Sequence, residues 1–568
     1  MRLVSILLIA APLFSQGIVS GNAPSLPRPK FSGLPFPVTF TDIAASAGLT
    51  MSHVSGSPER KRYIIEANGS GVAFLDYDED GRLDVFLLNG SRLEPPPPST
   101  SRLYRNTGSG KFVDVTTRAG LDRAGWGNGV CGGDFDNDGR LDLYLTYWGP
   151  NSLYRSQGDG SFTDIASRAG VAGPAGDWST GCTFLDYDRD GLLDLFVAGY
   201  AGFDPKKTPL PGQFPFCFFK GAPVFCGPRG LPHGSLTLYR NTGEGKFQDV
   251  SLETGIRKAT ACYAFTAVAA DLNHDGWTDL YVACDSTPSL YFRNNRGRDF
   301  SELATQAGIA YNEHGAEQAG MGLAIADYNN DGWLDITKTN FIRDYPNLYL
   351  NLGKGFFEDR AASSGLAINP HYVLWGAGLE DFDNDGWRDL FQVAGHVYPE
   401  LQKIEPYSNP RLLYRNLRNG KFEDVSHLAG PGVAALHSSR GAAFGDFDND
   451  GDVDVLVMNM HQPPSLLRND LTSSNNWIKV KLEGPAIGAT VIVHAGGLRQ
   501  SAPALSQSSF LSLNDRRLHF GLGEAKAVDR FTVRWSSGEE EEFPGMEANR
   551  LVLLVHGSRQ SKASPLPR

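Results

Sequence analysis

The sequence lacks the short motifs that mark common hydrolases and nucleotide-binding enzymes. No GxSxG, HExxH or P-loop pattern occurs, and no CxxC pair with a suitably spaced histidine indicates a zinc site. Basic residues are comparatively few, because 52 Lys and Arg stand against 64 Asp and Glu, giving a net charge of −12. Nucleic-acid binding depends on neutralising phosphates with Lys and Arg, so we expect no nucleic-acid partner.

Long apolar runs are missing beyond the N-terminus. Residues 3–14 are apolar and follow Arg2, and small residues come next. This run is too short to span a bilayer and is typical of a signal peptide, which we place at residues 1–21. No later run approaches the roughly 20 residues of a transmembrane helix. We therefore expect a secreted monomer, extracellular or periplasmic, without a membrane span.

One acidic pattern, D-x-D-x-D-G-x-x-D, recurs seven times along the chain. Each copy lies between two apolar stretches, which predicts a hairpin, and five copies are followed by a second hairpin such as LYRNTGSGKFVDV (103–115). We number these acidic loops 1 to 7; they occupy residues 75–84, 133–142, 185–194, 270–279, 326–335, 380–389 and 445–454.

Two hairpins make four strands, and a repeat of 50–60 residues fits one blade of a propeller. Residues 40–49 resemble the second half of an outer hairpin, and residues 466–470 resemble a first half without its partner. Pairing of these two ends would hide two edge strands. The sequence therefore predicts an all-β protein with a closed seven-bladed β-propeller over residues 38–471.

The acidic loops have the composition of a calcium site. Carboxylates at positions 1, 3, 5 and 9, with a carbonyl at position 7, can form the oxygen cage that Ca²⁺ prefers, and the glycine at position 6 permits the sharp turn. Magnesium is the weaker candidate, because it needs stricter octahedral geometry. We expect about seven Ca²⁺ ions, one per loop, with loops 4 and 5 slightly weaker because asparagine stands at position 3. The predicted ligands are Asp76, Asp78, Asp80, Arg82, Asp84, Asp134, Asp136, Asp138, Arg140, Asp142, Asp186, Asp188, Asp190, Leu192, Asp194, Asp271, Asn273, Asp275, Trp277, Asp279, Asp327, Asn329, Asp331, Trp333, Asp335, Asp381, Asp383, Asp385, Trp387, Asp389, Asp446, Asp448, Asp450, Asp452 and Asp454.

These loops resemble the FG-GAP/VCBS repeats of integrin α-subunits, which form a calcium-binding propeller. The FxDVxxxAGL stretches, CFFKGAPVFCGPRGL (217–231), CDSTPSLYFRN (284–294) and GHVYPE (395–400) look like the cartilage acidic protein family. The stretches NNWIKVKLEG (475–484), LNDRRLHFGLG (513–523) and VDRFTVRWSSG (528–538) look like its C-terminal ASPIC/UnbV domain. The resemblance implies a secreted calcium-binding protein and no known reaction.

The C-terminal region also reads as a separate module without the resemblance. Alternating apolar stretches separated by turns over residues 475–557 predict a small antiparallel β-sandwich. The tail 558–568 is polar with two prolines, and we expect it to be disordered.

Six cysteines in an exported chain permit disulfides, and 15 pairings are possible. The best local candidates are Cys217 with Cys226, which would close part of a Pro- and Phe-rich insertion at 199–236, and Cys262 with Cys284, which flank one inner hairpin. We expect the phenylalanines of that insertion, Phe218, Phe219 and Phe225, to project from the propeller or to pack down on a neighbour.

Polar residues gather at the blade ends opposite the acidic loops. This mouth of the propeller is a candidate ligand face, and the alternative is that these residues only cap strands. The candidate residues are Asp285, Asn340, His396, Arg440 and His461. Two functions follow as hypotheses. The first is a calcium-binding adhesion protein that presents loops to an extracellular protein or glycan. The second is an extracellular enzyme that acts on polysaccharide at the mouth, with His396 and Glu400, or His371, as acid–base candidates; no catalytic residue is assigned.

Overall fold

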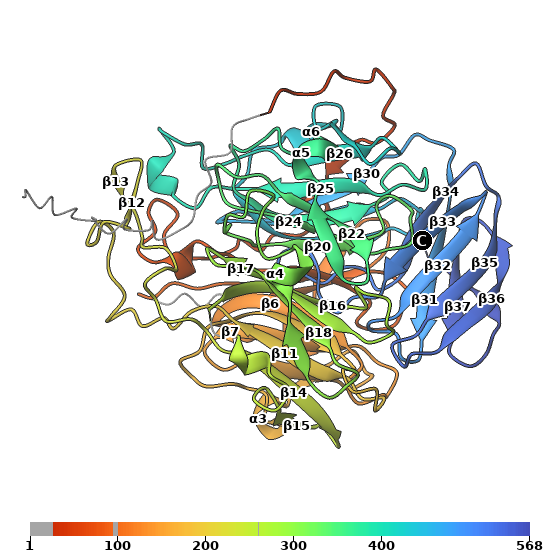
Figure 1. Ribbon diagram of the computed structural model, residues 1–568, viewed down its shortest axis with the longest axis horizontal. Helices are drawn as coiled ribbons and strands as arrows, with labels where there is room; N and C mark the ends of the chain where they lie inside the picture. Colours follow the sequence, from red (N-terminus) through yellow and green to blue (C-terminus); the bar gives the residue numbers. More distant parts are fainter. Residues whose placement is uncertain (1–25, 95–99, 260, 568) are drawn as a thin grey trace, which may run out of the picture.

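The computed structural model describes residues 26–94, 100–259 and 261–567, so the predicted signal peptide at 1–21 lies outside the described residues. Strands dominate, and the helices have only three or four residues. Among the described residues, no helix has the length and apolar character needed to cross a bilayer. The fold is nearly all-β, as the sequence predicts (Figure 1).

Each acidic loop joins the first two strands of a four-stranded antiparallel sheet, and the second hairpin supplies the other two. The described residues form seven such sheets. Their strands are β2 (Val72–Leu75), β3 (Asp84–Leu87), β4 (Arg102–Asn106) and β5 (Phe112–Asp114); β6 (Trp126–Gly133), β7 (Asp142–Trp148), β8 (Ser152–Ser156) and β9 (Phe162–Asp164); β10 (Ser179–Leu185), β11 (Asp194–Gly199), β14 (Leu236–Gly243) and β15 (Lys246–Asp249); β16 (Tyr263–Ala270), β17 (Asp279–Asp285), β18 (Leu290–Asn294) and β19 (Phe300–Glu302); β20 (Leu323–Ala326), β21 (Asp335–Lys338), β22 (Asn347–Gly353) and β23 (Phe356–Asp359); β24 (Leu374–Glu380), β25 (Asp389–Ala394), β26 (Leu412–Asn416) and β27 (Phe422–Asp424); and β28 (Ser439–Gly445), β29 (Asp454–Asn459), β30 (Ser465–Asn469) and β1 (Phe40–Asp42).

Short helices follow the outer hairpins. Five of them end at a glycine, within AGL after α1 and α2 and within AGV, AGI or SGL after α3, α4 and α5. This glycine adopts the left-handed conformation that closes a helix; Gly48 after α1, for example, has φ 92°. The helices are α1 (Ala44–Ala47), α2 (Thr116–Ala119), α3 (Ala166–Ala169), α4 (Ala304–Ala307), α5 (Ala361–Ser364) and α6 (Pro431–Ala434), with 3-10 turns η1 (Ile64–Glu66), η2 (Ile256–Lys258) and η3 (Pro399–Leu401).

The sheets close into a ring. Their first strands contact one another in the order β2, β6, β10, β16, β20, β24 and β28, and β28 contacts β2. The N-terminal strand β1 pairs with β30, and Phe40 stands opposite Asn469. Every residue of β2 and β3 is buried, because each sheet is covered on both faces by its neighbours. The structure thus confirms the predicted all-β fold of repeated four-stranded sheets and shows the expected pairing of the two ends of the repeat array.

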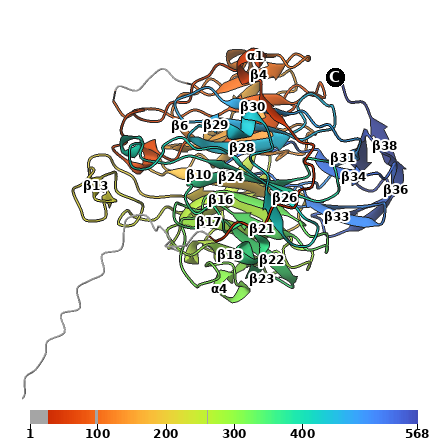
Figure 2. The same cartoon turned by 90° about the horizontal axis from the view of Figure 1, so that it is seen from above.

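The C-terminal module consists of two four-stranded sheets and lies beside the ring (Figures 1 and 2). One sheet has the order β34-β31-β37-β38 and the other β33-β32-β35-β36. The strands are β31 (Asn476–Glu483), β32 (Thr490–Ala495), β33 (Leu498–Pro503), β34 (Leu518–Gly523), β35 (Ala527–Arg534), β36 (Glu540–Glu547), β37 (Arg550–Val555) and β38 (Ser561–Ser564).

Two details of this module differ from the sequence predictions. The sandwich is not wholly antiparallel, because β31 and β37 pair in parallel. The tail 558–568, expected to be disordered, contains strand β38, which pairs with β37. Backbone hydrogen bonds to the edge strand β37 hold this polar segment in place, although the segment buries little apolar surface.

A long loop of the module, residues 505–514, enters the centre of the ring. Leu323 of β20 and Ser509 exchange two backbone hydrogen bonds, at 2.7 and 2.6 Å. The Phe74 N–H of β2 donates to the carbonyl of Leu513 at 3.0 Å. The loop therefore forms hydrogen bonds with backbone N–H and C=O groups of the inner strands. In a hollow channel these groups would bond to water.

The apolar part of this loop lies in the main hydrophobic core. The ring of Phe510, fully buried, contacts those of Phe265 at 5.3 Å and Trp375 at 4.9 Å between centroids. The loop thus joins the core of the propeller, while the sandwich keeps a separate core of its own around Phe520 and Phe531. The sequence patterns of propeller and sandwich did not predict this insertion.

Three disulfide bonds connect Cys131 with Cys182, Cys217 with Cys226 and Cys262 with Cys284. The second clamps the insertion, whose short strands β12 (Phe218–Phe219) and β13 (Ala222–Pro223) lie on the side of the ring away from the C-terminal module (Figures 1 and 2). The phenylalanines of the insertion differ in exposure. Phe218 is 41% exposed, whereas Phe219 and Phe225 are buried and contact Tyr398.

Candidate metal centre

The seven acidic loops share one turn. In loop 1 the Gly81 N–H donates to Asp76 Oδ2 at 3.0 Å, and Gly81 has φ 85°, a conformation that favours glycine. The equivalent bond from the position-6 glycine to the position-1 aspartate occurs in all of the other six loops. In loops 1 and 4 the other oxygen of the first aspartate has no hydrogen-bond partner among the described residues, whereas in the other five loops it accepts the N–H of position 5.

The position-9 aspartate is fixed by the second hairpin. Asp84 begins β3, and its Oδ1 accepts the Asn106 N–H of β4 at 2.7 Å. The same bond is made in the other six sheets, to the position-9 aspartate from the equivalent residue of the third strand. The LYRN stretch that follows each loop therefore positions a carboxylate of the loop itself.

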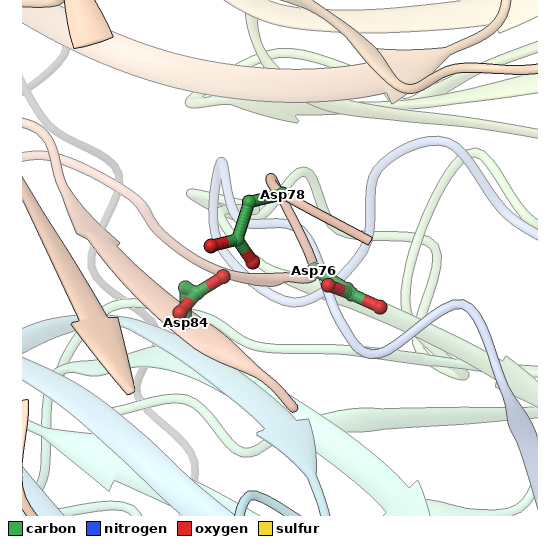
Figure 3. Close-up of side chains that lie close together, drawn as sticks. All are labelled: Asp76, Asp78 and Asp84. Atoms are coloured by element: carbon green, nitrogen blue, oxygen red, sulfur yellow. The ribbon is translucent and has the colours of Figure 1, made fainter. Parts of the chain in front are cut away.

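Three carboxylates lie close together in loop 1, those of Asp76, Asp78 and Asp84 (Figure 3). Their candidate ligand oxygens all lie within 4.8 Å of one another. The described residues form five such groups. They are Asp76, Asp78 and Asp84; Asp134, Asp136 and Asp142; Asp186, Asp188 and Asp194; Asp381, Asp383 and Asp385; and Asp446, Asp448 and Asp454.

Four of these groups contain buried oxygens without a hydrogen-bond partner in the described part of the chain: Asp76 Oδ1, Asp78 Oδ1 and single oxygens of Asp136, Asp188 and Asp448. Outside the groups, Asp271 in loop 4 and Asp389 in loop 6 each have one such oxygen. Burial raises the pKa of Asp76 to about 6 and that of Asp84 to about 8, because water cannot solvate their charges. A cation at the centre of each of the four groups would supply the missing partner, so the residues fit a bound metal ion.

Position 5 is oriented by the backbone of position 7, since the Arg82 N–H donates to Asp80 Oδ1 at 3.0 Å. An arginine of the third strand supplies further positive charge: Arg105 Nε lies 2.6 Å from Asp78 Oδ2. Similar pairs join Arg155 with Asp136 and Arg240 with Asp188. These arginines are only partly buried, so solvent weakens their attraction to the aspartates. They therefore reduce the negative charge of the loops without taking the place of a bound metal ion.

Loops 4 and 5 differ from the other five. In loop 4 the Asn273 Nδ2 donates to Asp279 Oδ2 at 3.1 Å, and the Tyr291 hydroxyl donates to the same oxygen at 2.8 Å. In loop 5 the Asn329 Nδ2 donates to Asp331 Oδ2 at 2.8 Å. Donors thus occupy oxygens that a metal would need. The sequence shows the asparagines at position 3, whereas only the structure shows that the Tyr291 hydroxyl donates to Asp279.

The predicted ligand residues at the opposite mouth are not exposed. Asp285 is buried and accepts the Tyr200 hydroxyl at 2.5 Å. Asn340 is buried and donates through Nδ2 to the Tyr345 carbonyl at 2.8 Å. Both side chains form hydrogen bonds with neighbouring polar groups of the protein. This agrees with the alternative that these residues cap strands and do not bind a ligand.

Arg440, His396 and His461 lie at the same mouth. Arg440 is fully buried and donates from Nε to the Ala67 carbonyl at 2.8 Å. His396 is buried, which lowers its pKa to about 3, and the half-buried His461 lies with Nε2 2.7 Å from Lys61 Nζ. The five candidates therefore do not form an open ligand face. Residues 61–67 contact His461 and Arg440, and Phe219 of the insertion contacts His396.

The C-terminal module contributes to the loop face in a way that the sequence did not predict. Lys479 Nζ contacts Asp446 Oδ2, and both side chains are buried. His519 Nε2 lies 2.6 Å from Asn384 Oδ1 in loop 6. Lys479 looks like an ordinary polar residue of an alternating strand, so only its place in the fold reveals its contact with a candidate metal ligand.

Comparison with known proteins agrees with this architecture. The model of the FG-GAP-like repeat matches residues 76–145, 134–197, 224–282, 271–337 and 381–457, and the model "ASPIC and UnbV" matches residues 479–561. Cartilage acidic protein 1 of Mus musculus is 27% identical over 532 residues, covering 87% of this chain and 74% of that protein. Integrin alpha-3 of Mus musculus is 28% identical over 189 residues, covering 31% and 17% of the respective chains.

Among solved structures, the exotype rhamnogalacturonan lyase YesX aligns with a TM-score of 0.36 at 11% identity, covering 76% of each chain. This likeness is too low to support an argument about activity. The repeat matches, in contrast, include the first aspartate of each of the seven acidic loops and leave out residues 198–223 and 338–380 between the first and the last match. The chain belongs to the FG-GAP repeat family, carries a C-terminal ASPIC/UnbV domain and is a homologue of cartilage acidic protein 1.

Proposed function

We propose that the protein is an extracellular calcium-binding propeller that presents loops to an extracellular protein or glycan. The observation that carries the metal assignment is the convergence of three carboxylates in each of five loops, with buried oxygens that lack partners. Calcium fits because all the donors are hard oxygens arranged around a flexible turn. Three disulfide bonds and the predicted signal peptide support an oxidising compartment outside the cytoplasm.

The role proposed for calcium is structural. Each ion would bind the folded chain and neutralise crowded carboxylates, which adds about 2.7 kcal/mol per site at a hundredfold excess over Kd. Loops 1, 2, 3, 6 and 7 should bind most strongly. Loops 4 and 5 should bind more weakly, because Asn273, Tyr291 and Asn329 place donors on carboxylate oxygens.

The surface proposed for ligand contact is the disulfide-clamped insertion with its neighbour, the 395–407 connection. Leu210, Phe214 and Phe218 of the insertion are 37%, 48% and 41% exposed, and Ile404 is 54% exposed. Lys220 of the insertion forms an ion pair with Glu405, which joins the two segments. Exposed apolar side chains on a constrained loop are typical of a protein contact surface.

The enzymatic alternative receives no comparable support. Its candidate acid–base pair, His396 and Glu400, lies at the mouth opposite the acidic loops, and burial lowers the pKa of His396 and raises that of Glu400. His396 is buried and Glu400 is half-buried, so the pair is not displayed on an exposed surface.

An array of extracellular proteins and glycans, probed with the full chain in calcium and in chelator, tests the proposal. Saturable binding without turnover is expected, and Phe214→Ser with Phe218→Ser should weaken it at least tenfold. The matched control is Leu352→Ser with Phe356→Ser, another exposed apolar pair on the β22–β23 hairpin. Equal loss in both double variants would contradict the assigned surface.

A further inference from the structure

A cavity of about 960 Å³ lies between the loop face of the propeller and the C-terminal module. Lys481, Glu483 and Gly484 line it and are exposed, so the cavity reaches the surface at the end of β31. Its size and its place between two folded parts are typical of small-molecule sites.

Apolar side chains from both parts form much of the wall. Phe444 comes from the propeller, Leu505 from the loop that enters the ring, and Leu551 from β37. The C-terminal tail closes one side, where the Asn449 Nδ2 of loop 7 donates to the Pro567 carbonyl at 2.6 Å. The wall can therefore accommodate the apolar body of a ligand and separate it from bulk water.

Most cations on this wall are already engaged by protein groups. Arg388 pairs with Glu380 at 3.1 Å, and Arg517 pairs with Asp515 at 2.9 Å. Lys479 contacts Asp446, as described above. These three side chains have defined structural partners and are not free to bind an anion.

Two cations in the described part of this wall have no such partner: Lys481, which is exposed at the end of β31, and Arg516. Arg516 lines the cavity and is only half-buried by protein atoms, and within the described residues its guanidinium makes no hydrogen bond or ion pair. Burial lowers its pKa, an effect that the more distant Asp134 and Asp142 of loop 2 partly oppose. An arginine has five N–H donors in a planar fork that matches a carboxylate, sulfonate or phosphate. An unengaged fork beside an apolar wall is the recognition chemistry for a molecule with one anionic group and an apolar body.

We propose that the interdomain cavity binds a small amphipathic organic anion, whose charged group pairs with Arg516 and whose apolar part contacts Phe444, Leu505 and Leu551. The competing explanation is that Arg516 only balances the charge of loop 2 and that the cavity contains water. The two explanations differ in whether the anionic group of a probe contributes to binding.

Two fluorescent probes with the same ring skeleton separate them: 1-anilinonaphthalene-8-sulfonate, which is anionic, and N-phenyl-1-naphthylamine, which is neutral. Each is titrated into the full chain in saturating calcium. The sulfonate should bind saturably with one site per chain and more tightly than the neutral probe. Arg516→Gln should weaken the sulfonate at least tenfold and leave the neutral probe unchanged, whereas Arg168→Gln, at an exposed position in α3, should change neither.

A second variant locates the site without altering charge. Ala486 lines the cavity and is only half-buried, so Ala486→Trp should fill space there and reduce binding of both probes at least tenfold. Melting curves check that each variant is folded. The proposal is overturned if neither probe binds saturably, if Arg516→Gln weakens both probes equally, or if sulfonate binding survives both substitutions. Under the competing explanation, Arg516→Gln would change calcium affinity alone.

Discussion

Lys479 of the C-terminal module contacts Asp446, the first aspartate of loop 7, and neither side chain is accessible to solvent. A strand of one folded part therefore provides a cation to a candidate metal ligand of the other. Docking of the module and the charge state of loop 7 are consequently linked, and this link can be measured.

Replacing Lys479 by methionine leaves the buried carboxylate of Asp446 without its ammonium partner. In chelator we expect a loss of about 3–5 kcal/mol in the free energy of unfolding, the usual result of breaking a buried ion pair. Calcium bound in loop 7 would supply positive charge instead, so the loss should be clearly smaller in saturating calcium. Denaturant unfolding under both conditions measures it, with the exposed neighbour Lys481→Met as control. An equal loss with and without calcium would contradict the coupling.

Closure of the ring depends on strand β1. Phe40 is fully buried and its ring contacts those of Phe382 at 5.5 Å and Phe391 at 5.7 Å. Phe40→Ala should reduce the free energy of unfolding by about 3–5 kcal/mol, because it leaves a cavity in the core. Phe356, which is 55% exposed, provides the control, and its alanine variant should stay within about 0.5 kcal/mol of the parent. Similar stability of the two variants would show that β1 is not essential to closure.

The repeat-level features of this fold could be predicted because each depends on local chemistry. The glycine at position 6 dictates the turn of each acidic loop, and the Asn-x-Gly-x-Gly stretches dictate the outer hairpins. The pairing of Phe40 with Asn469 followed from two half-hairpins at the ends of the array. None of these inferences needed to know which distant segments pack together.

Lys61 gives the stability a pH dependence of known sign. It is buried, which lowers its pKa from 10.5 to about 7. Between these pH values the unfolded chain binds a proton that the folded chain does not, so stability from this group rises with pH, by at most about 1.4 kcal/mol per unit. Lys61→Met removes this contribution. Its stability relative to the parent should therefore be highest near pH 7 and fall toward pH 9.5 in denaturant unfolding.

The exposed Lys207 offers the control, and Lys207→Met should show no such trend against the parent. A constant difference between Lys61→Met and the parent across this range would mean that Lys61 keeps its charge in the folded protein.

Loop 4 can be converted to the pattern of the other loops. Asn273→Asp restores the carboxylate at position 3, and Tyr291→Leu removes the hydroxyl that donates to Asp279 Oδ2. Leucine is the residue at the equivalent point of loop 1, Leu103. The double variant should retain one more calcium ion than the parent at limiting calcium in native mass spectrometry. Each single variant should show a smaller gain, and no gain in the double variant would mean that these donors do not control the site.

The parts that escaped prediction depend on contacts between distant segments. Ser509 and Phe510 belong to a stretch without periodicity, yet their partners Leu323 and Trp375 lie more than a hundred residues earlier. His396 and Arg440 were predicted at an open mouth because the sequence gives no sign that Phe219 of the insertion packs on His396 or that Arg440 bonds to Ala67. Strand β38 was missed because a polar edge strand has the composition of a disordered tail.

Calcium binding by the loops is the central claim, and isothermal titration calorimetry of the chelator-stripped full chain tests it most directly. We predict tight binding of at least five Ca²⁺ ions per chain, one for each loop that brings three carboxylates together, with up to two weaker sites from loops 4 and 5. Magnesium should bind much more weakly to the same chain. Absence of calcium binding, or fewer than five sites in a fully folded protein, would contradict the account.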